Sequence, residues 1–517
     1  MKGFIIALAA LSALAGGPDF DSAVLIISGA GSMEELDEST LEHFRSFYVH
    51  PLDLNRAARS RLLSSGLLNA FQVASLLDWR SRSGDILSYN ELALIDGFNT
   101  ETAEALKCFT RLQSADPPGR RKRGGWQHDI MLRGSVRTDM EEAPEAAGGL
   151  KYKLSKGDAA ELYWSSRTSY GDPRFGLGTL SAAWYGRSAK LVLGHFNARF
   201  GQGLIQWSGF SLSPYGSVNS FRRSSTGFSP TGSFTPGCCG IAADADLGRW
   251  NFGAAYSFTD KLPIAAVSYS ARRFAAGITA SGRSFSADFK YGLPGISLYG
   301  EAAWNGAPAA VAGMVWMPSY GNKTGLLMRW SGGKAEFLAG ASAKSLEAVA
   351  AYSREQFRAL LKYAPALELG RVRVQPALRF AAKLKDGWRL EGRSETKAEI
   401  GLLAVSLRFD LVKCKAVAWL LNAEAGYAGR QFKCWLRATL FCVDNWDDRI
   451  YVYERDAPGS FNVPAYYGRG RALSLAGSWK LPRRQALYWR CSYVDYPWMT
   501  EKKDARLEVK LQYQFSL

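Results

Sequence analysis

The last eleven residues of the chain alternate between apolar and polar side chains without a break. The apolar side chains are Leu507, Val509, Leu511, Tyr513, Phe515 and Leu517, and the polar ones are Glu508, Lys510, Gln512, Gln514 and Ser516. Successive side chains of a strand point to opposite faces. The segment is therefore predicted to be a β-strand with one apolar face and one polar face. The fold must place the apolar face in an apolar environment and the polar face in a polar one.

The same alternation continues through the rear part of the chain, from about Trp126 onward. Clear examples are residues 296–304, 371–384 and 403–411, and turns are predicted at Asn305-Gly306, Tyr320-Gly321-Asn322 and Lys385-Asp386-Gly387. Between about Leu247 and Gly370 the turn signals recur at intervals that suit membrane-spanning strands of about 9–11 residues. We predict a large antiparallel transmembrane β-barrel over residues 126–517, with roughly 20 strands and an even number between roughly 14 and 24.

A soluble β-sandwich would alternate too, but several sandwiches should show domain boundaries that this sequence lacks. Aromatic residues make up 13% of the chain, as the interfacial girdles of membrane barrels require. The closing strand, with Tyr513, Phe515 and Leu517, resembles the terminal assembly signal of outer-membrane β-barrels. That resemblance implies the barrel-assembly machinery and outer-membrane lipid as partners.

The beginning of the chain predicts export. Met1-Lys2 precedes an apolar run from Phe4, and Ala13-Leu14-Ala15 forms a small-x-small cleavage site, so residues 1–15 are predicted to be a signal peptide. No later apolar stretch reaches the length of about 20 residues that a spanning helix needs. If the chain sits in a membrane, it must cross with strands.

Charge divides the chain into two parts. Residues 16–113 hold 14 acidic and 8 basic side chains, whereas residues 114–517 hold 33 acidic and 55 basic ones. The basic segment 114–125 contains Pro117-Pro118 and the run Arg120–Arg123, and is predicted to be a solvated linker. Contact of this run with nucleic acid or lipid phosphates is the alternative. The organisation is thus α+β and multidomain, with an acidic front part and a basic rear part.

The front part, residues 16–113, is predicted to be a small all-α domain. Leu62, Leu63, Leu67 and Leu68, followed by Val73, Leu76 and Leu77, recur at helical spacing. About residues 53–112 resemble a tandem helix-hairpin-helix module, similar to the module of competence-type DNA receptors. The resemblance rests on residues 53–57, 76–80, Gly84, Leu87-Ser88, Leu92 and 95–99. The resemblance implies hairpins that present backbone N–H groups to a phosphate or to a partner.

The hairpins depart from the glycine–hydrophobic–glycine pattern of that module. The first keeps only Gly66, and the second has Gly97 and Phe98 but Asn99 in place of the second glycine. Asn tolerates a left-handed backbone, so we expect the turn to survive while close approach to a phosphate is hindered. The acidic domain also opposes DNA electrostatically. We therefore prefer a plug or protein-interaction role, with nucleic-acid binding as the alternative.

A second resemblance lies within the barrel region. Two short segments, Gly194-His195-Phe196 and the run Phe200–Phe210, resemble a signature of a poorly characterised family of Gram-negative outer-membrane barrels with an N-terminal helix-hairpin-helix module. The second segment contains Gly201, Gln202, Gly203 and Trp207. After this signature comes a Ser/Gly/Pro-rich segment, Ser208–Gly237, that is long enough to be functional. It either folds inward as a constriction or forms an external loop.

The polar faces of the predicted strands are rich in basic residues: Arg371, Arg373, Arg379, Lys383, Arg408 and Lys510. Charges on the lipid face cost about 2–4 kcal/mol at the midplane, so these side chains are expected to line the lumen. A basic lumen favours anionic solutes. Two other interpretations remain, in which the lumen holds the acidic domain as a plug or the charges pair inside a filled barrel.

Catalytic, metal and cofactor motifs are missing from the sequence, and neither an enzyme activity nor a cofactor is predicted. His195 is weighed as a lumen base beside a serine, as in a barrel phospholipase, but a lone strand histidine is more often structural. The seven cysteines include no C-x-x-C pair, so no metal is predicted, and their odd number leaves at least one free thiol unless a partner is bridged.

Together these features predict an outer-membrane β-barrel that acts as a channel, or as a subunit of an envelope transport or assembly complex. Its helical domain would be a plug inside the barrel or a periplasmic interaction domain with a protein partner. A DNA-uptake protein is the alternative function, and an outer-membrane enzyme is a third.

Overall fold

The computed structural model describes residues 20–113, 125–139, 143–234, 237–271, 273–293, 295–319, 321–370, 372–499 and 504–517. The predicted signal peptide, nearly all of the predicted linker and Arg371 lie outside these residues.

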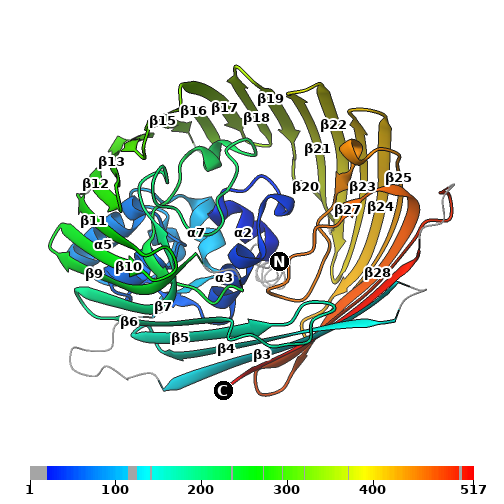
Figure 1. The fold of residues 1–517 in the computed structure, drawn as a ribbon, viewed down its shortest axis with the longest axis horizontal. Coiled ribbons are helices and arrows are strands. Elements are labelled where there is room, and N and C mark those ends of the chain that lie inside the picture. Colours follow the sequence, from blue (N-terminus) through cyan, green and yellow to red (C-terminus); the bar gives the residue numbers. More distant parts are fainter. Residues whose placement is uncertain are drawn as a thin grey trace, which may run out of the picture.

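Twenty-four strands form one closed antiparallel barrel (Figure 1). In chain order they are β3 (Trp126–Asp139), β4 (Glu145–Lys156), β5 (Ala160–Arg167), β6 (Thr179–Tyr185), β7 (Ala189–Arg199), β9 (Cys238–Leu247), β10 (Trp250–Ser257), β11 (Leu262–Ser270), β12 (Phe274–Ser281), β13 (Ser284–Leu293), β14 (Ile296–Trp304), β15 (Pro308–Ser319), β16 (Asn322–Ser331), β17 (Lys334–Ala343), β18 (Leu346–Ser353), β19 (Phe357–Tyr363), β21 (Val372–Leu384), β22 (Trp388–Ile400), β23 (Leu403–Lys413), β24 (Val417–Ala428), β25 (Phe432–Val443), β28 (Gly468–Leu481), β29 (Gln485–Asp495) and β30 (Arg506–Ser516). The short strands β8 (Gly227–Pro230) and β20 (Leu367–Leu369) pair with β7 and β21 but are not part of the ring.

The predicted terminal strand is confirmed, and it closes the barrel. Strand β30 pairs with β29 on one side and with β3 on the other, where Asp129 lies opposite Ser516 and Asp139 opposite Arg506. The strands thus form a single closed barrel and not several separate β-sandwiches. The prediction of roughly 20 strands was too low, because many connections take only two or three residues and leave room for more strands.

The two faces of the wall have opposite character, as the alternation predicts. On β23, Leu407 is 53% exposed on the outer face, whereas its neighbour Arg408 is 6% exposed on the inner face. Many large apolar side chains are exposed in the same way around the barrel, among them Leu132, Trp184, Ile278, Phe337, Phe380 and Leu436. The wall therefore has an apolar exterior and a polar interior.

The two rims of the barrel differ in the length of their connections. Strand β3 begins and β30 ends at the same rim, which we call the terminal rim; most turns there have two or three residues, as at 248–249 and 401–402. The two longest connections leave β7 and β25 at the opposite rim, which we call the loop rim.

Both long connections fold against the inner face of the wall. In the first inner segment, residues 200–234, the N–H groups of Gln202 and Leu204 donate to Glu301 of β14 at 2.6 and 3.2 Å. Its 3-10 helix η2 (Val218–Phe221) packs on Leu327 and Leu338 of the wall. The Ser/Gly/Pro-rich segment therefore folds into the barrel and does not form an external loop.

The second inner segment, residues 444–467, was not predicted from the sequence. It contains η3 (Trp446–Asp448) and the paired strands β26 (Ile450–Tyr451) and β27 (Ala465–Tyr466). The Asp448 carboxylate accepts the N–H groups of Cys414, Lys415 and Ala416, and Lys510 donates to Asp456 at 2.9 Å.

The front part is helical, as expected. It contains α2 (Phe20–Ser28), η1 (Met33–Glu35), α3 (Glu38–Val49), α4 (Arg59–Ser64), α5 (Ala70–Ser83), α6 (Tyr89–Leu92) and α7 (Thr100–Leu106), and a parallel pair of short strands, β1 (Leu52–Asp53) and β2 (Thr110–Arg111). Asp37, Asn69, Ser88 and Asn99 cap four of these helices. The core contains Phe44, Leu62, Leu76, Leu106 and Phe109, and within the described residues no helix is long and apolar enough to cross a membrane.

In Figure 1 the helices are drawn within the ring of strands, next to β3–β11. Tyr453 and Phe461 of the second inner segment and Phe210 of the first pack against the helical core. The helices, the inner segments and the wall therefore meet in one packed region.

Candidate functional site

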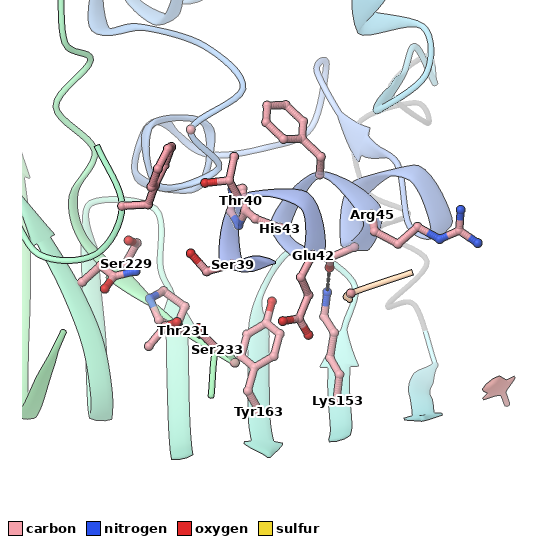
Figure 2. Close-up of a pocket in the computed structure, with 18 of the residues that line it drawn as sticks. Ser39, Thr40, Glu42, His43, Arg45, Lys153, Tyr163, Ser229, Thr231 and Ser233 are labelled. Carbon is pink, nitrogen blue, oxygen red and sulfur yellow. Dashed lines mark hydrogen bonds between the residues drawn. The ribbon is translucent and has the colours of Figure 1, made fainter. Parts of the chain in front are cut away.

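A cavity of about 330 Å³ between the helices and the wall is lined by many polar side chains. One side is helix α3, the second is the inner face of β3, β4 and β5, and the third is the first inner segment. In Figure 2, Glu42 of α3 lies next to Lys153 and Tyr163 of the wall, the Arg45 side chain points away from them, and Ser229, Thr231 and Ser233 lie at the side. Strands β3 to β7 and β9 form what we call the docking wall.

The amphipathic pattern of α3 explains how it faces the cavity. Leu41, Phe44 and Phe47 recur at helical spacing and are buried in the core of the helical domain. Glu38 and Glu42 lie one turn apart on the face turned to the wall. The Asp37 side chain accepts the N–H groups of Ser39 and Thr40, which fixes where the helix begins.

Charged side chains of α3 pair with the docking wall. The Glu42 carboxylate contacts the ammonium group of Lys151, and Glu38 lies 3.3 Å from Arg133. His50 lies 2.7 Å from Asp129, while Lys153 donates to Ser46 at 2.7 Å. Glu38 and Glu42 of the helical domain thus pair with basic groups of the wall. This agrees with the acidic front part and the basic rear part of the sequence.

Helix α4 makes the reverse pairing, with cations on the helix and carboxylates on the wall. Arg61 lies 2.7 Å from Glu161 and is stacked over the ring of Tyr185, and both charged side chains are almost fully buried. Arg59 contacts Asp246 of β9. Burial alone would lower the pKa of Arg61, but Glu161 outweighs it and raises the pKa above its usual value. Arg61 therefore stays charged, and its position depends on the wall carboxylate.

The tip of the helical domain reaches the opposite side of the barrel. Glu34 in η1 lies 2.6 Å from Arg408 and 3.2 Å from Arg393. Burial tends to raise the pKa of Glu34, but the two arginines outweigh it and hold the pKa well below its usual range. Neighbouring Glu35 accepts the N–H group of Gly31, and burial raises its pKa.

Three arginines, Arg199, Arg222 and Arg223, line the cavity, and two of them lie over the ring of Trp207. The guanidinium groups of Arg199 and Arg223 lie 5.6 and 5.1 Å from the ring centre of Trp207, a cation–π arrangement. Arg222 donates to Ser297, and burial lowers the pKa of both Arg222 and Arg223. With the described residues, none of the three forms an ion pair. The cavity is therefore cationic and rich in hydroxyl groups.

The signature residues of the first inner segment hold its turn on the wall. Gly201 and Gly203 take positive φ angles of 56° and 80°, and a Cβ atom on Gly201 would lie 2.7 Å from the Glu301 carboxylate carbon. The Gln202 side chain accepts the N–H group of Arg223 at 3.0 Å. The glycines therefore permit a close approach of the backbone to Glu301.

The two predicted hairpins join α4 to α5 and α6 to α7. Gly66 and Gly97 take positive φ angles of 63° and 91°. Asn99 does not use the left-handed backbone that we expected; it is extended at φ −143°, and its side chain caps α7 by accepting the Thr102 N–H group. Gly66 lies near His43 and Thr226, whereas Gly97 packs on Phe71 and Phe98 is buried.

The predicted lumen cations fall into three groups. Arg408 and Lys510 pair with carboxylates of the tip and of the second inner segment. Arg379 and Lys383 line a further cavity, described below. Arg373 lies 3.6 Å from Glu368 near the terminal rim, and Arg371 lies outside the described residues.

The predictions for His195 and the cysteines concern the wall itself. His195 shares the outer face of β7 with exposed Leu191 and Leu193, and its Nδ1 atom accepts the Leu180 N–H group at 3.1 Å. The interpretation of His195 as a lumen base is therefore wrong, because the strand register turns it outward. None of the seven cysteines forms a disulfide with another described residue, and the described residues include no metal-ligand cluster.

Comparison with known proteins gives only distant similarity. No protein-family model matches the chain, and no curated protein matches it. Among solved structures, OpdO of Pseudomonas aeruginosa shares 12% identity over 76% of this chain and 97% of its own, with a TM-score of 0.31. OccAB3 of Acinetobacter baumannii shares 11% identity over 76% and 99%, with a TM-score of 0.32, and the outer-membrane protein OpdK of P. aeruginosa 10% over 76% and 99%, with a TM-score of 0.33. Overlap this slight carries no argument about function.

Proposed function

We propose that this chain is an outer-membrane β-barrel channel whose lumen is closed by its own N-terminal helical domain. The observation that carries the proposal is the set of ion pairs between the helices and the inner face of the wall. Glu34, Glu38, Glu42, Arg59 and Arg61 each pair with a wall residue of opposite charge. A domain that was only a periplasmic attachment would need no such complementarity with the lumen.

The exterior of the wall supports a membrane location. A ring of exposed Leu, Val, Phe and Trp side chains costs free energy in water but is stable in lipid, and a closed barrel leaves no unpaired strand edge. The contrast between the rims supports an orientation as well. Outer-membrane barrels have short periplasmic turns and longer extracellular loops. The terminal rim, with the helical domain beside it, would then face the periplasm.

The build of the helical domain supports the helix-hairpin-helix interpretation, since two helix pairs are joined by turns with glycine at positive φ. Its surroundings favour a plug over DNA binding. The first hairpin is turned toward His43 and the first inner segment, and the second is flanked by Asp96 and Glu101. Phosphate binding would require cationic, accessible hairpins.

Bilayer recordings test the proposal. We expect small or rare currents from the mature chain, and large currents from a variant that lacks residues 20–113. Resistance of the deletion variant to unfolding in cold detergent is the control for an intact barrel. If both proteins are silent although the deletion variant is folded, the channel proposal is wrong. Equal currents from both proteins would remove the plug and leave the channel.

A further inference from the structure

A second polar surface of the lumen lies across from the docking wall, on β19, β21 and β22, which we call the cationic wall. The strand register places Arg358 directly opposite Lys383, and Lys383 directly opposite Arg389. Four residues further along β21, about 13 Å at the rise of a strand, Arg379 lies opposite both Lys362 and Arg393. Two rows of like charges thus cross three adjacent strands.

Like charges directly opposite each other in a sheet are destabilising, so each row should be balanced by negative charge nearby. The row through Arg379 has acidic residues of the protein beside it. Glu347 lies opposite Lys362 at one end, Asp410 lies opposite Arg393 at the other, and the Glu34 carboxylate pairs with Arg393. Carboxylates of the protein therefore flank this row at both ends, and Arg393 forms ion pairs with two of them.

The row through Lys383 lacks such compensation. Arg358 lies opposite Ala351 on its other side, and neither Arg358 nor Lys383 forms an ion pair with any described residue. The buried Nε atom of Arg358 has no hydrogen-bond partner. Only Arg389 is paired, with Glu391 at 2.6 Å. The row keeps an excess of positive charge that nothing in the described chain neutralises.

These side chains face a built cavity. Arg358, Arg379, Lys383 and Arg389 line a space of about 150 Å³, and Tyr215 of the first inner segment stacks with Arg358 at 4.1 Å. Val349 and Leu360 contribute an apolar floor. A second space of about 450 Å³ shares Arg379 and Arg389 and extends to Glu34 and Glu35 of the plug tip.

We infer that the cationic wall binds an organic anion with two or more negative charges, held by Arg358 and Lys383 over the apolar floor of the cavity that Arg379 also lines. A di- or tricarboxylate fits this combination, because carboxylates pair with the arginine fork and carbon atoms cover Val349 and Leu360. The inference deepens the proposed function and rests on it, since it names the class of solute that would cross the lumen. In the row beside it, Arg393 pairs with Glu34 and Asp410, which shows that this surface accepts carboxylates.

Titration calorimetry on the full-length protein in detergent at low salt tests the inference. Citrate and pyrophosphate are the probes, and the variant combines Arg358→Gln with Lys383→Gln. The control combines Lys334→Gln with Arg484→Gln, which removes the same charge at hairpin turns. We expect the wild type and the control to bind citrate, and the variant to lose at least tenfold in affinity. Tighter binding of citrate than of pyrophosphate supports an organic anion, whereas binding of pyrophosphate alone contradicts it.

Two results overturn the inference: binding of neither probe by the wild type, and equal binding by wild type and variant. Failure of the inference and failure of the proposed function are distinguishable, because binding is measured without current. A protein that conducts after removal of the helices but binds no anion contradicts the inference alone. A protein that binds citrate but never conducts contradicts the channel alone.

Discussion

The docking wall and the cationic wall carry the same kinds of basic side chain but differ in what those side chains meet. On the docking wall, Lys151 meets Glu42 and Arg133 meets Glu38, both from the helical domain. On the cationic wall, Arg358 and Lys383 lie opposite each other and form no described ion pair. The comparison teaches that cations in a lumen have two uses, since paired ones hold a domain in place and unpaired ones remain available to a solute.

The largest effect should come from a buried pair of the docking wall. Arg61→Ala leaves Glu161 buried without its cation, and losing one partner of a buried pair costs about 3–5 kcal/mol. We expect hydrogen exchange in residues 59–83 to rise sharply and open-channel currents to become frequent. Arg82→Ala is the control, because Arg82 is 65% exposed where it pairs with Asp78 at 2.9 Å, and a surface pair is worth at most about 1 kcal/mol. Equal effects of the two substitutions would break the comparison.

A smaller effect is expected at the tip of the helical domain. Glu34→Gln removes the charge that Arg393 and Arg408 share, but both arginines keep Asp410. Charged hydrogen bonds are worth about 1.5–3 kcal/mol, so the open fraction in bilayer recordings should rise roughly tenfold or more. Glu101→Gln, at an exposed position of α7, should leave the recordings unchanged. An unchanged open fraction in the Glu34 variant would mean that the tip does not hold the plug.

Acid should loosen docking through Glu34 and His43. The pKa of Glu34 is lowered in the docked state, so its contribution is complete above its ordinary pKa of about 4.5 and is lost as the pH falls below it. Burial lowers the pKa of His43, so its neutral form is favoured when docked and its contribution is lost as the pH falls below about 6.5. We expect currents to increase between pH 7 and pH 4. A current that stays constant or decreases over this range would argue against His43, whose contribution is lost within it.

The smallest effect is expected on the cationic wall. Lys383→Gln removes a repulsion from Arg358 and Arg389 and should change the free energy of unfolding by about 1 kcal/mol or less, toward greater stability. Lys151→Gln, the matched change on the docking wall, strands the Glu42 carboxylate and should destabilise. Thermal unfolding in detergent compares the two variants. If Lys383→Gln destabilises as much as Lys151→Gln, the two walls do not differ as described.

Local alternation was sufficient to predict the strands of the barrel. Residues 403–411 and the terminal strand have the predicted faces, with Arg408 and Lys510 turned inward. The strand number was underestimated because alternation does not fix turn length. The second inner segment was missed because its apolar and polar residues have no period, although Asp447, Asp448, Glu454 and Asp456 mark it as an acidic run in a basic region.

The candidate sites were harder to predict, because they depend on register and on contacts that are distant in sequence. Arg358 and Arg389 were not singled out, since only cross-strand pairing places them beside Lys383. His195 was weighed as a lumen base, although the exposed Leu191 and Leu193, four and two residues earlier, share its face and mark that face as the outer one. That alternation was a usable signal for the histidine, whereas the pairing of Arg61 with Glu161 left no signal in the sequence.

Zero-length carbodiimide coupling of the unmodified protein in membranes tests the central claim, that the helical domain docks inside the lumen. The reagent joins an amine to a carboxylate in contact, and mass spectrometry identifies the joined peptides. Lys510 with Asp456, at 2.9 Å between the wall and an inner segment, is the positive control. We predict a second product that joins Lys151 of the wall to Glu42 of α3, and its loss in Lys151→Gln. Formation of the control product without any product between helices and strands would contradict the account.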